Sequence, residues 1–137
     1  YQDNTAIKDL IAKCANYNLK SINPLTITEL LSNLSTSKYI LATRLHSTIF
    51  STILKVPFIT ISYQEKVTNF IEDIGMDKYN QNINNFDITN LINQKDLLLS
   101  DYDNVKNILT QVVIENHEKL EISKKIFLEF ILKDQKV

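Results

Sequence analysis

The sequence predicts an α/β fold in which helices flank a parallel sheet and a long helix follows at the C-terminal end. The apolar runs at 38–42 and 57–62 have the composition of buried parallel strands. Helical patterns follow each run at short spacing, which favours parallel strands joined by right-handed crossovers. With 137 residues, of which 44% are hydrophobic, the chain has the size and the core of one domain over 1–137.

The first third of the chain predicts a helix, a short strand and a second helix. Apolar residues at helical spacing indicate a helix over 4–17, with Asn4 as its N-cap. A strand is expected at 19–22, and the Asn-Pro pair that follows it at 23–24 is expected to end it. A helix over 26–33 follows, and its first residues form a capping-box pattern.

The middle of the chain carries the clearest α/β pattern. After the first apolar run we expect a helix over 44–54, and after the second a helix over 65–74 whose apolar residues share one face. Gly75 is the only glycine, and it stands where a left-handed C-terminal cap is expected.

The C-terminal part is less regular before it becomes helical. The Asn-rich segment 77–96 has little periodicity, and a short strand is expected at 86–88. Ser100 is the expected N-cap of a helical extension over 101–133. Either one long helix or two helices with a bend near Asn116 fit the pattern.

Composition and charge narrow the classes of partner. The net charge is −1, so there is no basic field of the kind that binds nucleic acid, and no nucleic-acid partner is predicted. No apolar run reaches the roughly 18 residues that a membrane span needs. Cys14 is the only cysteine, which excludes an intramolecular disulfide and fits a reducing compartment.

Several polar residues fit structural roles. His117 lies among glutamates, which is typical of a solvated helix face, and no metal site is predicted. Asp101 and Asp103 stand where acidic side chains favour the dipole at a helix N-terminus. Cys14 lies on an apolar stripe and is interpreted as a small core residue.

Arg44 is the residue that the sequence singles out as functional. It is the only arginine among 15 basic residues, and His46 follows two positions later. Both lie where the strand 38–42 ends and a helix begins, which in open α/β sheets is the edge where ligands bind. The exposed amides at a helix N-terminus attract anions.

The residue types there suit a small anion with several charges. A guanidinium binds a carboxylate or phosphate through two parallel hydrogen bonds, which Lys cannot do, and His46 can hydrogen-bond or transfer a proton near neutral pH. If the helix begins at about His46, Arg44 and His46 face one side of extended backbone while Leu45 packs inward. Ser47 and Thr48 add hydroxyls. A surface ion pair at Arg44 and a plain helix start at His46 are the alternative.

The stretch YILATRLHSTIFSTILKVPFITISYQEKVTNF, residues 39–70, resembles the signature of the polysaccharide pyruvyl transferase family. That pattern is an apolar strand, Arg-Leu-His-Ser, an apolar helix, Val-Pro, a second apolar strand, Ser-Tyr and a Lys three residues after the Tyr. The matching residues are Arg44, Leu45, His46, Ser47, Val56, Pro57, Ser62, Tyr63 and Lys66. The combination is more specific than Arg-Leu-His alone, and it covers about a quarter of the chain.

The resemblance implies a two-domain fold like that of GT-B glycosyltransferases, with two Rossmann-like halves and the active site between them. The chain would be the C-terminal, donor-binding half of a longer protein. The implied donor is phosphoenolpyruvate, and no further cofactor is implied. The implied reaction adds pyruvate to two hydroxyls of a saccharide acceptor as a cyclic ketal, in surface polysaccharide biosynthesis for the cell envelope.

The resemblance also assigns roles by residue. Arg44 and His46 would be catalytic and would contact phosphoenolpyruvate, with Arg44 on its anionic groups. Leu45 would contribute its backbone amide to donor binding. Ser47, the last residue of the Arg-Leu-His-Ser motif, would also be a donor-binding residue. Tyr63 and Lys66 would line the same cleft, since they follow the adjacent strand.

Two departures from the family pattern matter. Lys55 stands where the family usually has Gly or another small residue, which predicts strain in that turn. The N-terminal half, which would hold the acceptor site, is not among these 137 residues, so we expect this chain alone to be inactive.

Two other readings keep the fold. One is a GT-B-type glycosyltransferase that uses a nucleotide sugar. The other is a non-catalytic anion-binding or interaction module with the Asn-rich residues 80–93 as its variable surface. For the transferase we expect a cytoplasmic location and an acceptor carried on a lipid or on a nucleotide. A lipid-linked acceptor would go with peripheral attachment of the enzyme to the inner face of the membrane.

Overall fold

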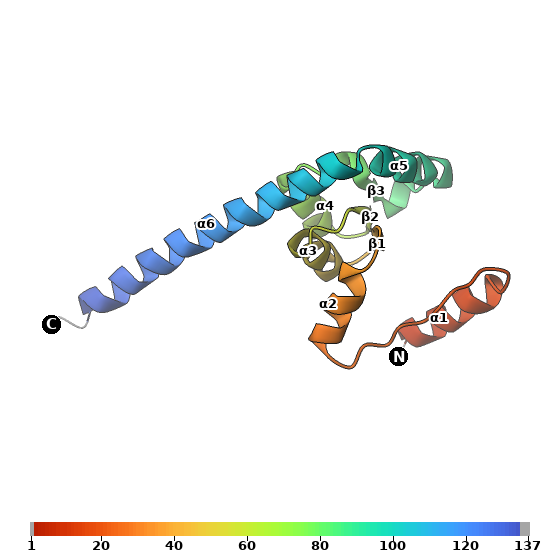
Figure 1. The fold of residues 1–137 in the computed structure, drawn as a ribbon, viewed down its shortest axis with the longest axis horizontal. Coiled ribbons are helices and arrows are strands. Elements are labelled where there is room, and N and C mark those ends of the chain that lie inside the picture. Colours follow the sequence, from red (N-terminus) through yellow and green to blue (C-terminus); the bar gives the residue numbers. More distant parts are fainter. Residues whose placement is uncertain (1, 135–137) are drawn as a thin grey trace. The chain divides into compact units, whose positions relative to one another are not determined.

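The computed structural model describes the backbone of residues 2–134 and the side chains of residues 5–128. The chain divides into two compact units, residues 1–30 and residues 31–137. The smaller unit is helical, and the larger one contains the sheet (Figure 1).

The smaller unit contains helix α1 (Gln2–Lys13) and the start of helix α2 (Ile27–Ser35). Asn4 lies inside α1, so it is not the N-cap, and the helix ends earlier than the sequence predicts. The strand predicted at 19–22 is not formed. A strand needs a hydrogen-bonded neighbour, and the described residues of this unit contain no other strand.

The capping box at the start of α2 is confirmed. The N–H of Glu29 donates to Thr26 Oγ1 at 3.2 Å, and the N–H of Thr26 donates to Glu29 Oε2 at 3.4 Å. These reciprocal bonds satisfy two amides that the helix itself leaves without partners, which explains why α2 begins at Ile27.

The larger unit is built on three parallel strands in the order β1 (Ile40–Ala42), β2 (Phe58–Ser62) and β3 (Asn80–Asn82). The prediction of a parallel sheet is therefore confirmed. The central strand β2 is almost wholly buried. In β1 only Ala42 is fully buried, and Leu41 remains 49% exposed, so this strand is less enclosed than its apolar sequence predicts.

The third strand lies at 80–82 and not at 86–88 as the sequence predicts. Its central residue, Gln81, is buried, and hydrogen bonds satisfy its amide. Gln81 Nε2 donates to Gln94 Oε1 at 3.0 Å, and Gln81 Oε1 accepts the N–H of Asp87 at 3.0 Å. A strand whose buried side chain is a paired amide has no apolar run, which is why hydrophobic patterning missed it.

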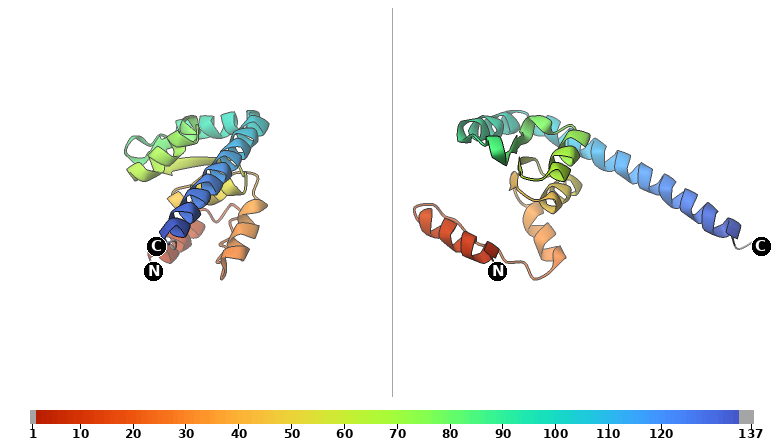
Figure 2. Two further views of the ribbon diagram at one scale, coloured as in Figure 1. Left: turned by 90° about the vertical axis from the view of Figure 1, so that its left-hand side faces the viewer. Right: turned by 180° about the vertical axis from the view of Figure 1, so that it is seen from behind.

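Helices cover both faces of the sheet. Helices α3 (Leu45–Ile53) and α4 (Glu65–Asp73) each connect successive parallel strands, so right-handed crossovers place both on one face. Helix α5 (Ile88–Ser100) packs against β2 on the other face, where Gln94 meets Gln81. Helix α6 (Tyr102–Asp134) packs along α3 and is one continuous helix (Figure 2), so the alternative with two helices is wrong.

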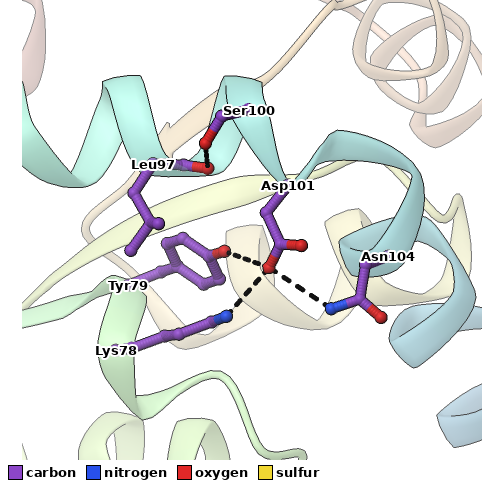
Figure 3. Close-up of polar contacts among 6 residues, drawn as sticks. All are labelled: Lys78, Tyr79, Leu97, Ser100, Asp101 and Asn104. Atoms are coloured by element: carbon purple, nitrogen blue, oxygen red, sulfur yellow. Dashed lines mark hydrogen bonds and ion pairs between the residues drawn. The ribbon is translucent and has the colours of Figure 1, made fainter.

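The long helix begins later than the sequence predicts. Ser100 is the last residue of α5 and not an N-cap, and α5 itself is not predicted. Asp103 lies in the first turn of α6, as predicted. Asp101 lies between the two helices, where its Oδ2 accepts hydrogen bonds from Lys78 Nζ at 2.9 Å, Tyr79 OH at 3.1 Å and Asn104 Nδ2 at 3.3 Å (Figure 3).

The hydrophobic core of the larger unit lies between the sheet and the helices on its two faces. It combines residues from β2, α4, the segment before β3, α5 and the first turns of α6. These residues are Phe58, Ile59, Val67, Ile71, Ile74, Met76, Tyr79, Leu98, Val105 and Leu109.

Candidate functional site

The carboxyl ends of the three strands lie at one edge of the sheet, and the predicted site residues follow two of these ends. Ala42 pairs with Thr60 across β1 and β2, and Ser62 pairs with Asn82 across β2 and β3. Because parallel strands end at the same edge, the loops into α3 and α4 also meet there. The topology therefore brings Arg44, which precedes α3, to the same edge as the residues that precede and begin α4.

Arg44 is the N-cap residue of α3. Its backbone is extended (φ −121°, ψ 147°), and its side chain does not cap the helix. The helix begins at Leu45, so His46 already has helical backbone. The prediction that Arg44 and His46 face one side of extended backbone required the helix to begin at about His46, one residue later. Arg44 and His46 are nevertheless both exposed, while Leu45 packs against the core between them.

The side chains after Arg44 are ordered by contacts within α3. The ring centroid of His46 lies 6.3 Å from that of Phe50, one turn further along the helix. Ser47 is half-buried, and Thr48 Oγ1 donates to the carbonyl of Leu45 at 2.6 Å. Thr48 is fully buried, so its hydroxyl does not add to the exposed polar groups at the start of α3.

The N-termini of α3 and α4 lack a cap from the side chain of the N-cap residue. Neither Arg44 nor Gln64, the two N-cap residues, makes a side-chain cap hydrogen bond. By contrast, Asp87 caps α5 by accepting the N–H of Thr89. The first turn of α3 contains no acidic residue, whereas α4 has Glu65 in its first turn. The start of α3 therefore presents the stronger positive dipole end to an anion.

Tyr63 and Lys66 lie at the start of α4. Both are exposed, Tyr63 by 47%, so Tyr63 is not held in the core. Two hydrogen bonds hold the loop that carries these residues. Thr68 Oγ1 donates to Ser62 Oγ at 3.1 Å, and Ser62 Oγ donates to the carbonyl of Gln81 at 3.3 Å. These bonds join the start of α4 to the ends of β2 and β3.

Asn82, at the end of β3, reaches the same edge, and sequence reasoning missed it. Its side-chain Oδ1 accepts the N–H of Asn84 at 2.9 Å. The only sequence signal was the Asn-rich composition of this segment, which does not distinguish a short polar strand from a loop.

Other features of the described residues lie away from this edge. An apolar pocket lined by Tyr39, Leu41, Ile59, Leu91, Ile92 and Lys95 contains none of the predicted site residues. His117 is exposed on α6, as predicted. Within the part of the chain that the structure describes, no group of three or more His, Cys, Asp or Glu side chains could hold a metal ion.

Across the described residues, no helix combines the length and the apolar character that crossing a bilayer requires.

Residues 1–65 of the chain match the family model described as polysaccharide pyruvyl transferase. The matched range contains Arg44, Leu45, His46, Ser47 and Tyr63 and stops one residue before Lys66. The family resemblance is therefore confirmed for this part of the chain. No curated protein and no solved structure matches the sequence.

Proposed function

Starting from the match of residues 1–65 to polysaccharide pyruvyl transferases, we propose that this chain is the donor-binding half of such an enzyme. The donor is phosphoenolpyruvate, and the product is a cyclic ketal of pyruvate on two hydroxyls of a saccharide. The other half of a GT-B-like fold supplies the acceptor site. The enzyme is cytoplasmic and reaches acceptors carried on a nucleotide or, at the inner face of the membrane, on a lipid.

The observation that carries this proposal is the position of Arg44. It is the only arginine of the chain, and it stands exposed at the N-terminus of α3, a helix whose first turn contains no acidic residue. A guanidinium beside helix amides that its own side chain does not cap suits a ligand that bears both a carboxylate and a phosphate. The amide of Leu45 is among those that the helix leaves without an internal partner.

His46 supplies the proton chemistry of the proposed reaction. Ketal formation adds a proton to the methylene carbon of the donor, joins two acceptor oxygens to the adjacent carbon and releases phosphate. A histidine within reach of the phosphate can hydrogen-bond it and protonate it as it leaves. Tyr63 and Lys66 are exposed at the start of the neighbouring helix, and in this proposal they add donors for the anion.

Calorimetric titration of the full-length protein with phosphoenolpyruvate tests the proposal. We expect binding to the wild type, and a loss of about tenfold or more in affinity for Arg44→Lys, because the substitution keeps the charge and removes the two-pronged hydrogen bond. Binding by Arg44→Lys as tight as by the wild type contradicts the assignment of Arg44. Binding of a nucleotide sugar in place of phosphoenolpyruvate supports a glycosyltransferase instead.

A second titration separates the donor half from the whole enzyme. We expect the chain of 137 residues alone to bind phosphoenolpyruvate without transferring pyruvate, because the acceptor site lies in the other half of the proposed fold. Pyruvate transfer by the isolated chain contradicts the proposed division of the site.

A further inference from the structure

We propose that Asn82 is a further donor-binding residue, whose side-chain amide donates a hydrogen bond to the anionic group that Arg44 does not hold. This inference rests on the proposed function. Nothing in the family pattern that led to Arg44 and His46 extends to β3, so Asn82 enters only through the tertiary structure.

The register of the sheet brings Asn82 close to Arg44. Ser62 pairs with Asn82, and Ala42 pairs with Thr60. The pairing of β1 ends at Ala42, and Arg44, two residues further on, has extended backbone before α3 begins. Neighbouring strands are about 4.8 Å apart, so the ends of β1 and β3 lie about 10 Å apart on either side of β2. A three-carbon ligand with an anionic group at each end fits between side chains that reach in from both positions.

Asn82 also faces the correct side of the sheet. Paired residues on neighbouring strands project to the same face, so Asn82 shares a face with Ser62. The hydroxyl of Ser62 accepts a hydrogen bond from Thr68 of α4, which identifies this face as the one that α3 and α4 cover. Asn82 is exposed at the end of its strand, beyond the layer that those helices bury.

The hydrogen bonding of Asn82 leaves its donor group available. Oδ1 accepts the backbone N–H of Asn84, and this bond fixes which side-chain atom is oxygen and which is nitrogen. Nδ2 carries two N–H groups, and neither has a hydrogen-bond partner among the described residues. The bond from Asn84 to Oδ1 orients the side chain, and the neutral N–H donors of Nδ2 are suited to an anionic oxygen.

Two substitutions separate this role from the capping role. In Asn82→Asp a carboxylate oxygen can still accept the N–H of Asn84, but the donor is lost and a negative charge faces the anion. In Asn82→Ser the hydroxyl can keep the cap with no new charge. Asn85→Asp is the matched control, because it introduces the same charge at an exposed position three residues further on.

Calorimetric titration of the full-length protein with phosphoenolpyruvate is the test. We expect affinity to fall about tenfold or more in Asn82→Asp and severalfold in Asn82→Ser, with unfolding temperatures close to wild type, and little change in Asn85→Asp. Wild-type affinity in Asn82→Ser, or equal losses in Asn82→Asp and Asn85→Asp, overturns the inference. Absence of phosphoenolpyruvate binding to the wild type overturns the proposed function itself.

Discussion

Lys55 and Gly75 occupy the same position at the ends of α3 and α4. Both have left-handed backbone, with φ 56° for Lys55 and 70° for Gly75. In each case the amide of this residue and the next amide bond back to carbonyls of the last helical turn: Lys55 to Thr52 and Val56 to Ser51, and Gly75 to Glu72 and Met76 to Ile71. Both helices therefore end in the same hydrogen-bonded motif, one with glycine and one with lysine.

Replacing Lys55 by Gly is expected to stabilise the protein by roughly 0.5–1 kcal/mol. Left-handed backbone costs a residue with a Cβ about 1–2 kcal/mol, and glycine removes this cost. Part of the resulting stabilisation is offset because glycine adds conformational freedom to the unfolded chain. Lys55 is exposed, so no packing is lost. Urea unfolding of the two proteins measures the difference, and a Lys55→Gly variant less stable than wild type contradicts the strain that the sequence predicts.

Gly75→Ala is the matched experiment at the other helix end. A Cβ at Gly75 would meet no atom within 4 Å, so the cost comes from the backbone conformation alone. We expect a loss of about 1 kcal/mol. A neutral result at Gly75 would show that the left-handed backbone costs little in this motif.

Thr60→Val is expected to raise the free energy of unfolding by about 1 kcal/mol. Thr60 is fully buried in β2, and its Oγ1 has no hydrogen-bond partner among the described residues. A buried hydroxyl without a partner costs desolvation, and Val has nearly the same shape. Ser62→Ala is the control. Its hydroxyl makes two hydrogen bonds, so the same chemical deletion should destabilise by about 1 kcal/mol.

Asp101 predicts a specific dependence of stability on pH. Hydrogen bonds from Lys78 and then Asn104 hold the pKa of Asp101 below its ordinary value of 3.8. A carboxyl group with a lowered pKa in the folded state stabilises the fold above the unfolded value, and this contribution is lost as the pH falls through the lowered pKa. Asp101→Asn should therefore be less stable than wild type at neutral pH, and the difference should shrink below about pH 4.

Unfolding in urea at several pH values measures this difference. Asp103→Asn is the control, because Asp103 is exposed two residues further on and has no hydrogen bond among the described residues. A difference between wild type and Asp101→Asn that does not change with pH would show that the contribution of Asp101 is not its charge.

The two histidines provide a test of catalysis. We expect His46→Ala in the full-length protein to lower pyruvate transfer about 10²–10⁴-fold, which is the usual contribution of a general acid or base. His117→Ala should leave the rate unchanged, because His117 is exposed on α6 and was assigned to a solvated face. Equal rates for His46→Ala and wild type would remove His46 from the proposed mechanism.

Local patterns predicted most of the helices and two of the three strands. The capping box before α2, the left-handed end at Gly75 and the apolar strands at β1 and β2 all depend on residues close together in the chain. The strand expected at 19–22 does not form, because a segment with strand propensity needs a neighbouring strand, and the described residues of its compact unit contain none.

The sequence by itself determined the order of elements around Arg44 and the residue types that suit an anion. Only the tertiary structure decided that the polar segment 80–82 is the third strand, because the bonds that satisfy Gln81 come from Gln94 and Asp87, which lie further along the chain. That pairing places Asn82 at the edge where Arg44 stands. Long-range hydrogen bonds, and not local periodicity, complete the candidate site.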